Sequence, residues 1–437
     1  MSLITALETW LPRVEAAAQA LGLDPGPVDF RLVPAPVLYE AVAYHGLGGY
    51  GHWTRGRDYW RTKEQLDRGR GRIYEVVFNG NPIIAYLLEG NTLAAQILVM
   101  AHVMGHAAIM RHHVLEDQSG VALAARMNAA RQRFMAYTEQ VGPQAVEATL
   151  DAALSIQDQV AEHQPTGEPP AATPPDPDGV LWASSEHRQS VGLRRRRNRQ
   201  TLRGLPTADL LGWIAREAPG LDEWQRDICQ VVREEGLSFR PLRGIKTIHE
   251  SFAVWTHRAI LRALDLPSDL AVEAERVHAQ VVAPHPLQWN PYALYPLLEA
   301  MAEDYGLTAA IGIWMQESDA SLIRNYLTLP YWERLQLYGW QWEEGWEADR
   351  AVHGRQDWKR MRDGLADALA RTPPQVIVQR VDADNTLWLH HPDEGYALDP
   401  GWAQKTLAAI KQLWGGDVSL VDHGTHWLDD TKKEEHA

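Results

Sequence analysis

The chain of 437 residues is 45% hydrophobic and 23% charged, which is typical of a globular protein of two or three domains whose core needs no disulfides. Its one cysteine, Cys229, excludes an internal disulfide and a cysteine-rich zinc motif. The net charge of -15 argues against general nucleic-acid binding by the surface. We find no signal-peptide pattern and no stretch with the ~18 uncharged apolar residues of a membrane span, so we expect a cytoplasmic protein.

Residues 1–163 are expected to form an N-terminal region of helices around one hairpin. Apolar residues recur at helical spacing, and turn residues separate the segments. The hairpin is formed by the segments 71–79 and 83–88, for which two helices are the alternative. In chain order we predict a helix at 3–22, a short helix at 37–44, a loop rich in glycine and aromatic residues at 45–53, strands at 71–79 and 83–88, and helices at 93–113, 122–135 and 143–162.

A linker or mobile loop is predicted at 164–205, because prolines and then arginines dominate its composition. The run Arg194 to Arg197 permits a phosphate or nucleic-acid interpretation, and we favour a solvated charge run because the whole chain is acidic.

The rest of the chain divides into a second helical region at 206–345 and a small α/β domain at 370–425. The whole is therefore an α+β protein that is mainly helical. The predicted elements are helices at 208–218, 223–235, 247–264, 271–282 and 292–305, then strands at 375–380, 386–390 and 417–421 with a helix at 400–414.

Two histidines on the predicted helix 93–113 carry the strongest chemical signal. His102 and His106 are four residues apart, so both project from one face, about one turn apart. Zinc proteases present two imidazoles to one metal in this way, with a glutamate directly after the first histidine as the base. Val103 occupies that position here, so a metal site is indicated without its usual base.

Glu250 is the candidate for the third metal ligand. The segment after it, small and then aromatic, resembles the third-ligand helix of thermolysin-like and aminopeptidase-like zinc enzymes, which predicts a zincin-like helical core. His257, seven residues later on the same face, and His249 are expected to support the ligands by hydrogen bonds, and His257 is alternatively a fourth ligand. The competing interpretation is a structural hydrogen-bond network of Glu250 and histidines without metal.

A catalytic base has to come from elsewhere, and Glu89 is the candidate. Apolar residues flank it, and burial there raises a carboxyl pKa toward the range useful for proton transfer. The alternative is a carboxylate that interacts with the free N–H groups of the helix start. Glu40 and Glu75 are weaker candidates, for which we favour a solvent-facing or charge-paired role. His390 and His391 are adjacent with diverging side chains, and we expect them at the surface.

Several motifs resemble the SpoVR (stage V sporulation protein R) family over nearly the whole chain. The matching segments are 38–44, 52–53, 73–77, 85–91, 99–103 with His106, 224–227, 232–235, 246–250, 255–257, 290–292, 323–327 and the final α/β segment. The chain departs from the family pattern at His249-Glu250-Ser251-Phe252, at 107–110, and in the proline- and arginine-rich insertion.

The resemblance implies a role in forming the spore cortex, a modified peptidoglycan, and implies a process more firmly than a reaction. Our first hypothesis is a zinc-dependent hydrolase of peptide or amide bonds, with zinc held by His102, His106 and Glu250 and a peptidoglycan-related peptide or precursor as substrate. The second is a non-catalytic assembly or regulatory factor that works with other sporulation proteins and uses the His/Glu cluster structurally. Nucleic-acid binding through the arginine run is a distant third.

Overall fold

The computed structural model describes residues 2–44, 49–68, 75–116, 120–161, 205–283, 291–337, 339–340, 351–352, 358–370, 373–392, 397–423 and 425–428. The predicted linker lies outside these ranges apart from Leu205, as does the arginine run. The chain forms two compact units, each built from two separate segments: 1–129 with 240–371, and 130–239 with 372–437. The sequence instead predicts consecutive regions at 1–163, 206–345 and 370–425.

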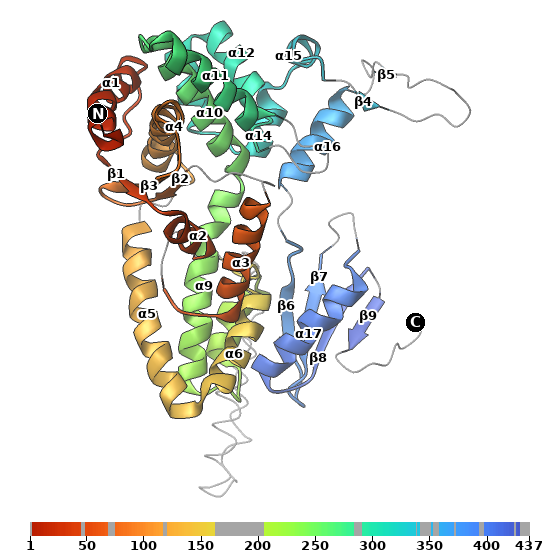
Figure 1. Ribbon diagram of the computed structural model, residues 1–437. Coiled ribbons are helices and arrows are strands. Elements are labelled where there is room, and N and C mark those ends of the chain that lie inside the picture. Colours follow the sequence, from red (N-terminus) through yellow and green to blue (C-terminus); the bar gives the residue numbers. More distant parts are fainter. Residues whose placement is uncertain are drawn as a thin grey trace, which may run out of the picture. The chain divides into compact units, whose positions relative to one another are not determined.

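The first unit begins with helices around a small three-stranded sheet of order β1-β3-β2 (Figure 1). The predicted hairpin is confirmed, since β2 and β3 pair antiparallel with Glu75 opposite Leu87. The strand β1, which runs parallel to β3, was missed although its apolar residues alternate. The elements are α1 (Leu3–Ala20), β1 (Val28–Val33), α2 (Ala35–Ala43), α3 (Trp53–Asp67), β2 (Glu75–Phe78) and β3 (Ile83–Leu88).

Helix α4 (Leu93–His112) is the core of this unit, and every residue from Ala94 to Ile109 is buried. Thr92 caps it, accepting a hydrogen bond from the Ala95 N–H. Among the described helices, α4 alone is long and apolar enough to cross a membrane. This corrects our expectation that no stretch has the length and apolar composition of a membrane span. In this protein 89% of the most apolar window of α4 is buried in the interior. A helix buried on all sides needs internal partners for its polar side chains.

Helix α10 (Lys246–Ala263) packs against α4 at very close range. A Cβ atom placed on Gly105 would lie 2.6 Å from the Cα atom of Ala253, so only glycine allows this approach. Asp319 fixes the start of α10, because its carboxylate accepts hydrogen bonds from the N–H groups of Thr247 (2.9 Å) and Ile248 (2.7 Å).

The remaining elements of the first unit complete its core. Phe252, Trp255 and Trp314 form a buried aromatic group with centroids 5.2 to 5.8 Å apart. The elements are α11 (Ser268–Val282), α12 (Tyr295–Tyr305), α13 (Leu307–Trp314), α14 (Asp319–Tyr326), α15 (Leu329–Arg334), β4 (Gly339–Trp340), β5 (Ala351–Val352) and α16 (Trp358–Ala370).

The second unit combines helices with a four-stranded sheet of order β6-β7-β8-β9. The predicted C-terminal strands and helix are confirmed, with one further strand, β9. Trp213 stacks on Trp414 with ring centroids 5.1 Å apart. The unit boundaries fall within α5 (Gly120–Val141) and α9 (Glu223–Arg243). The other elements are α6 (Pro143–Ser155), α8 (Leu210–Glu217), β6 (Ile377–Val381), β7 (Leu387–His391), α17 (Pro400–Trp414), β8 (Val418–Asp422) and β9 (Thr425–Leu428).

Candidate metal centre

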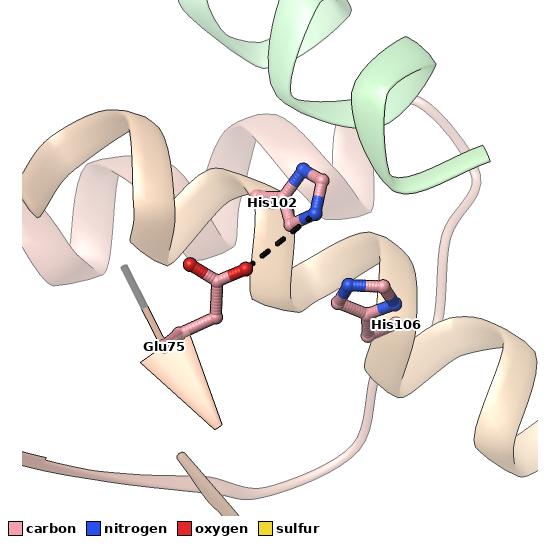
Figure 2. Close-up of side chains that lie close together, drawn as sticks. All are labelled: Glu75, His102 and His106. Atoms are coloured by element: carbon pink, nitrogen blue, oxygen red, sulfur yellow. Dashed lines mark ion pairs between the residues drawn. The ribbon is translucent and has the colours of Figure 1, made fainter. Parts of the chain in front are cut away.

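The two histidines of the sequence motif face a carboxylate inside the first unit. His102 and His106 lie one turn apart on α4, are buried, and have ring centroids 4.6 Å apart. Glu75 reaches toward them from the start of β2 (Figure 2). One ligand atom from each of the three residues lies within 4.8 Å of the others.

The separation of these groups suits a shared cation better than direct pairing. His102 Nε2 and Glu75 Oε1 are 3.7 Å apart, which is beyond a good hydrogen bond. Two ligands that each lie about 2 Å from one zinc ion are separated by somewhat more than 3 Å. The three donors therefore converge at nearly the spacing of a coordination shell.

A chain of imidazoles supports His102 from behind. Its Nδ1 lies 3.0 Å from His257 Nδ1, and His257 Nε2 lies 2.8 Å from His278 Nδ1. In each contact one ring nitrogen carries the proton and the other accepts it. When His102 Nδ1 donates, its Nε2 presents a lone pair on the side of Glu75, which is the tautomer a metal ligand needs.

His106 has an equivalent support on α10. Its Nδ1 lies 2.6 Å from His249 Nδ1, and His249 Nε2 lies 3.3 Å from Glu116 Oε1. Histidines that bind metals usually donate their second N–H to such a partner, which fixes the ring orientation. The close approach of α10 to α4 at Gly105 brings His257 within reach of His102 and His249 within reach of His106.

Burial controls the protonation of the cluster. Burial, with the charge of His249 adding to it, lowers the pKa of His102 to about 3. Burial and the neighbouring imidazoles also lower the pKa values of His106 and His257 well below the usual range. All three rings are therefore neutral at pH 7, with lone pairs available to a cation.

Two half-buried carboxyl groups, those of Glu75 and Glu250, lie close enough for the charge of Glu250 to act on Glu75. Burial, and then the charge of Glu250, raise the pKa of Glu75 to about 8. Burial also raises the pKa of Glu250, against the lowering effect of His249 and Lys246. Two buried carboxylates repel each other without a counter-ion, and a divalent cation between them reverses that balance.

The predicted carboxylates are placed differently from one another. Glu250 lies on α10 near enough to Glu75 to affect its ionisation, but the converging group of ligand atoms contains Glu75. The assignment of Glu250 as a metal ligand stays a prediction. Glu89 is exposed in the turn after β3, where its N–H donates to the Val33 carbonyl at 3.0 Å. The burial expected at Glu89 is therefore absent, because the last residue of β3 ends the buried alternation.

Glu75 was discounted from the sequence, although the hairpin contains a signal for it. Residues directly opposite in an antiparallel pair share one face of the sheet. Glu75 lies opposite Leu87, which is buried, and β3 leads directly into α4. A carboxylate cross-strand from a core leucine is unusual and needs a partner.

Comparison with known proteins identifies the family of the chain. The family model described as SpoVR like protein matches residues 2–372, and the chain belongs to this family. A protein of Escherichia coli (strain K12) described as "Uncharacterized protein YcgB" is 25% identical over 476 residues, which cover 95% of this chain and 91% of that protein. No solved structure matches the chain.

Proposed function

We propose that this SpoVR-family protein binds one divalent transition-metal ion, with zinc as the first candidate, between α4 and β2. The convergence of His102, His106 and Glu75 within 4.8 Å carries the proposal. Imidazole nitrogens with one carboxylate suit zinc and related ions, whereas calcium and magnesium prefer oxygen ligands alone.

The chemistry that follows is hydrolysis with zincin-like geometry. Three protein ligands leave a coordination position for water, and bound zinc lowers the pKa of such a water to about 7. We assign Glu75 as the third ligand and Glu250 as the base that accepts the proton of the water, in place of the glutamate that Val103 replaces. The sequence instead predicts Glu250 as the ligand and Glu89 as the base.

The substrate class follows from the family. SpoVR proteins are associated with formation of the spore cortex, so we propose a peptide or amide bond in a peptidoglycan-related peptide or precursor as the substrate. This part rests on the resemblance, and the metal site rests on geometry.

A non-catalytic assembly or regulatory factor in sporulation is the second candidate. It is favoured by one observation: the contacts from His102 through His257 to His278 are 3.0 and 2.8 Å long, and they satisfy His102 Nδ1 and both ring nitrogens of His257 without an ion. In that case the cluster specifies the packing of α10 on α4, and the protein acts by contacts with other sporulation proteins.

Metal analysis of the purified full chain separates the two candidates. We expect the variant His106→Ala to retain one metal equivalent fewer than the wild type after dialysis. His112→Ala is the matched control, because His112 is on the same helix but exposed. A wild type that takes up no zinc, cobalt or manganese while folding normally would contradict the metal proposal and leave the structural role.

The two glutamates are then distinguished with zinc-loaded protein and cell-wall peptides as substrate. The variant Glu75→Gln is expected to lose metal, whereas Glu250→Gln is expected to keep the metal and lose hydrolysis. Loss of metal in Glu250→Gln with retention in Glu75→Gln would exchange the roles. Absence of hydrolysis in the zinc-loaded wild type on all peptidoglycan-derived amides would reject the hydrolase while the metal site stands.

A further inference from the structure

A second group of metal-ligating side chains lies in the other unit, beyond residue 372, where the family match ends. The strands β7 and β8 are parallel neighbours, and helix α17 lies between them in sequence. His391 and Asp422 are the last residues of these strands and pair with each other in the register. Ligands of α/β sheets bind at the carboxyl ends of parallel strands, which is the edge where this pair lies.

The side chains at this edge converge on one carboxylate oxygen. Asp422 Oδ1 accepts hydrogen bonds from His391 Nδ1 at 2.9 Å and from His423 Nδ1 at 2.7 Å. A bound cation would take the place of these two ring protons, since a ligating imidazole nitrogen is deprotonated. The Leu398 N–H donates to the other oxygen, Oδ2, at 3.0 Å and holds the carboxylate plane. One ligand atom from each of His391, Asp422 and His423 lies within 4.8 Å of the others.

The three side chains of this group differ in how deeply they are buried. The side chains of His391 and Asp422 are 0% and 3% exposed, whereas that of His423 is 32% exposed. The expectation that His391 lies at the surface is therefore wrong; its neighbour His390 is on the other face of β7, and only His390 is partly exposed. A site with two interior ligands and one at the rim is open to solvent on one side.

The backbone at the rim is held in an uncommon conformation. His423 has φ 47°, in the left-handed region that few residues other than glycine adopt. This conformation follows directly after the last residue of β8 and places the ring beside Asp422. A residue held in such a region at a cluster of polar groups is consistent with a constraint from function.

We propose that His391, Asp422 and His423 form a second site for a divalent transition-metal ion. Two imidazole nitrogens and one carboxylate oxygen are a donor set for zinc, cobalt, nickel or iron(II), with further positions left for water or an exogenous ligand. The Leu398 N–H contact orients the carboxylate from behind, as supporting groups do at metal sites. This site is independent of the centre on α4.

The test uses the full chain, stripped of metal and titrated with Co²⁺, whose visible absorption reports coordination. In a His106→Ala background, which disables the first centre, we expect one Co²⁺ per chain to bind. Adding His423→Ala is expected to weaken Co²⁺ binding by about tenfold or more. Loss of a direct ligand costs at least as much metal affinity as loss of a supporting group, which typically costs about 10–100-fold. His390→Ala is the matched control and is expected to leave it unchanged.

His423 is chosen because it lies at the rim, so its replacement is expected to leave the fold intact, as far-UV circular dichroism will verify. Asp422→Asn is a second variant that keeps the shape of the side chain. No spectral change with Co²⁺ in the His106→Ala background, or equal binding in His423→Ala, would overturn the proposal. If the first centre binds no metal, the same test is made without His106→Ala, by comparing Co²⁺ binding of the wild type with that of the single variant His423→Ala.

Discussion

Gly105 of α4 and Ala253 of α10 are in backbone contact, and the candidate metal centre depends on this contact. A Cβ atom at Gly105 would also lie 2.9 Å from the hydroxyl oxygen of Thr256. The two histidine pairs, His102 with His257 and His106 with His249, flank this crossing point. The site is therefore a product of how closely two helices approach.

Gly105→Ala is expected to lower the free energy of unfolding by about 1–3 kcal/mol, the usual cost of overpacking a core. It is also expected to weaken metal binding, because α10 must move away with His249 and His257. Urea unfolding and metal titration measure the two effects. The control is Gly56→Ala in α3, where an added Cβ meets nothing within 4 Å. Equal stability of Gly105→Ala and wild type would show that the helices are not in the described contact.

Removing a supporting histidine is expected to have a smaller effect than removing a ligand. His249→Ala or His257→Ala takes away the acceptor behind His106 or His102, and such changes typically cost about 10–100-fold in metal affinity. We expect each variant still to bind metal at the centre on α4 at saturation, whereas His106→Ala loses the metal of this centre. Competition with a chelator measures the affinity. If His257→Ala abolished binding altogether, His257 would be a ligand instead of a support.

Asp319→Ala is expected to destabilise the first unit by about 1–3 kcal/mol, because the N–H groups of Thr247 and Ile248 lose their shared acceptor in a buried place. Asp319→Asn is expected to recover part of this loss, since its amide oxygen still accepts one bond. Thermal unfolding measures the series. Asp367→Ala is the control, because its ion pair with Arg324 is exposed. A loss of stability as large as that of Asp319→Ala in this control would argue against a specific cap.

The buried thiol of Cys229 makes the stability of the second unit depend on pH. Burial raises the pKa of its thiol from 9.0 to about 12. A raised folded-state pKa favours the protonated form, so the contribution of Cys229 to stability is complete below pH 9 and is lost as the pH rises toward 12. In this window the wild type is expected to lose up to about 1.4 kcal/mol per pH unit more than Cys229→Ala, as measured by urea unfolding.

The same burial predicts that iodoacetamide does not modify the native protein at neutral pH and modifies it fully in denaturant, because the thiolate is the nucleophile. Mass spectrometry counts the adducts. Rapid native modification would show that Cys229 is accessible and would remove the basis of the alkaline prediction.

The hairpin, the long helix with its paired histidines and the C-terminal α/β region could be predicted because each depends on local periodicity. His102 and His106 share a face through helical spacing alone, and the Thr92 cap follows from the residues beside it. The family could also be recognised from motifs that lie close together in the chain.

The partners of those histidines depended on tertiary structure. Glu75 rather than the exposed Glu89 faces the pair, because strand pairing sets its face of the sheet. His391 is buried because β7 is covered in the folded sheet, which its position beside His390 in sequence does not reveal. Sequence spacing sets which side chains share an element, whereas contacts between distant elements arise from packing of whole faces, and no local pattern encodes that packing.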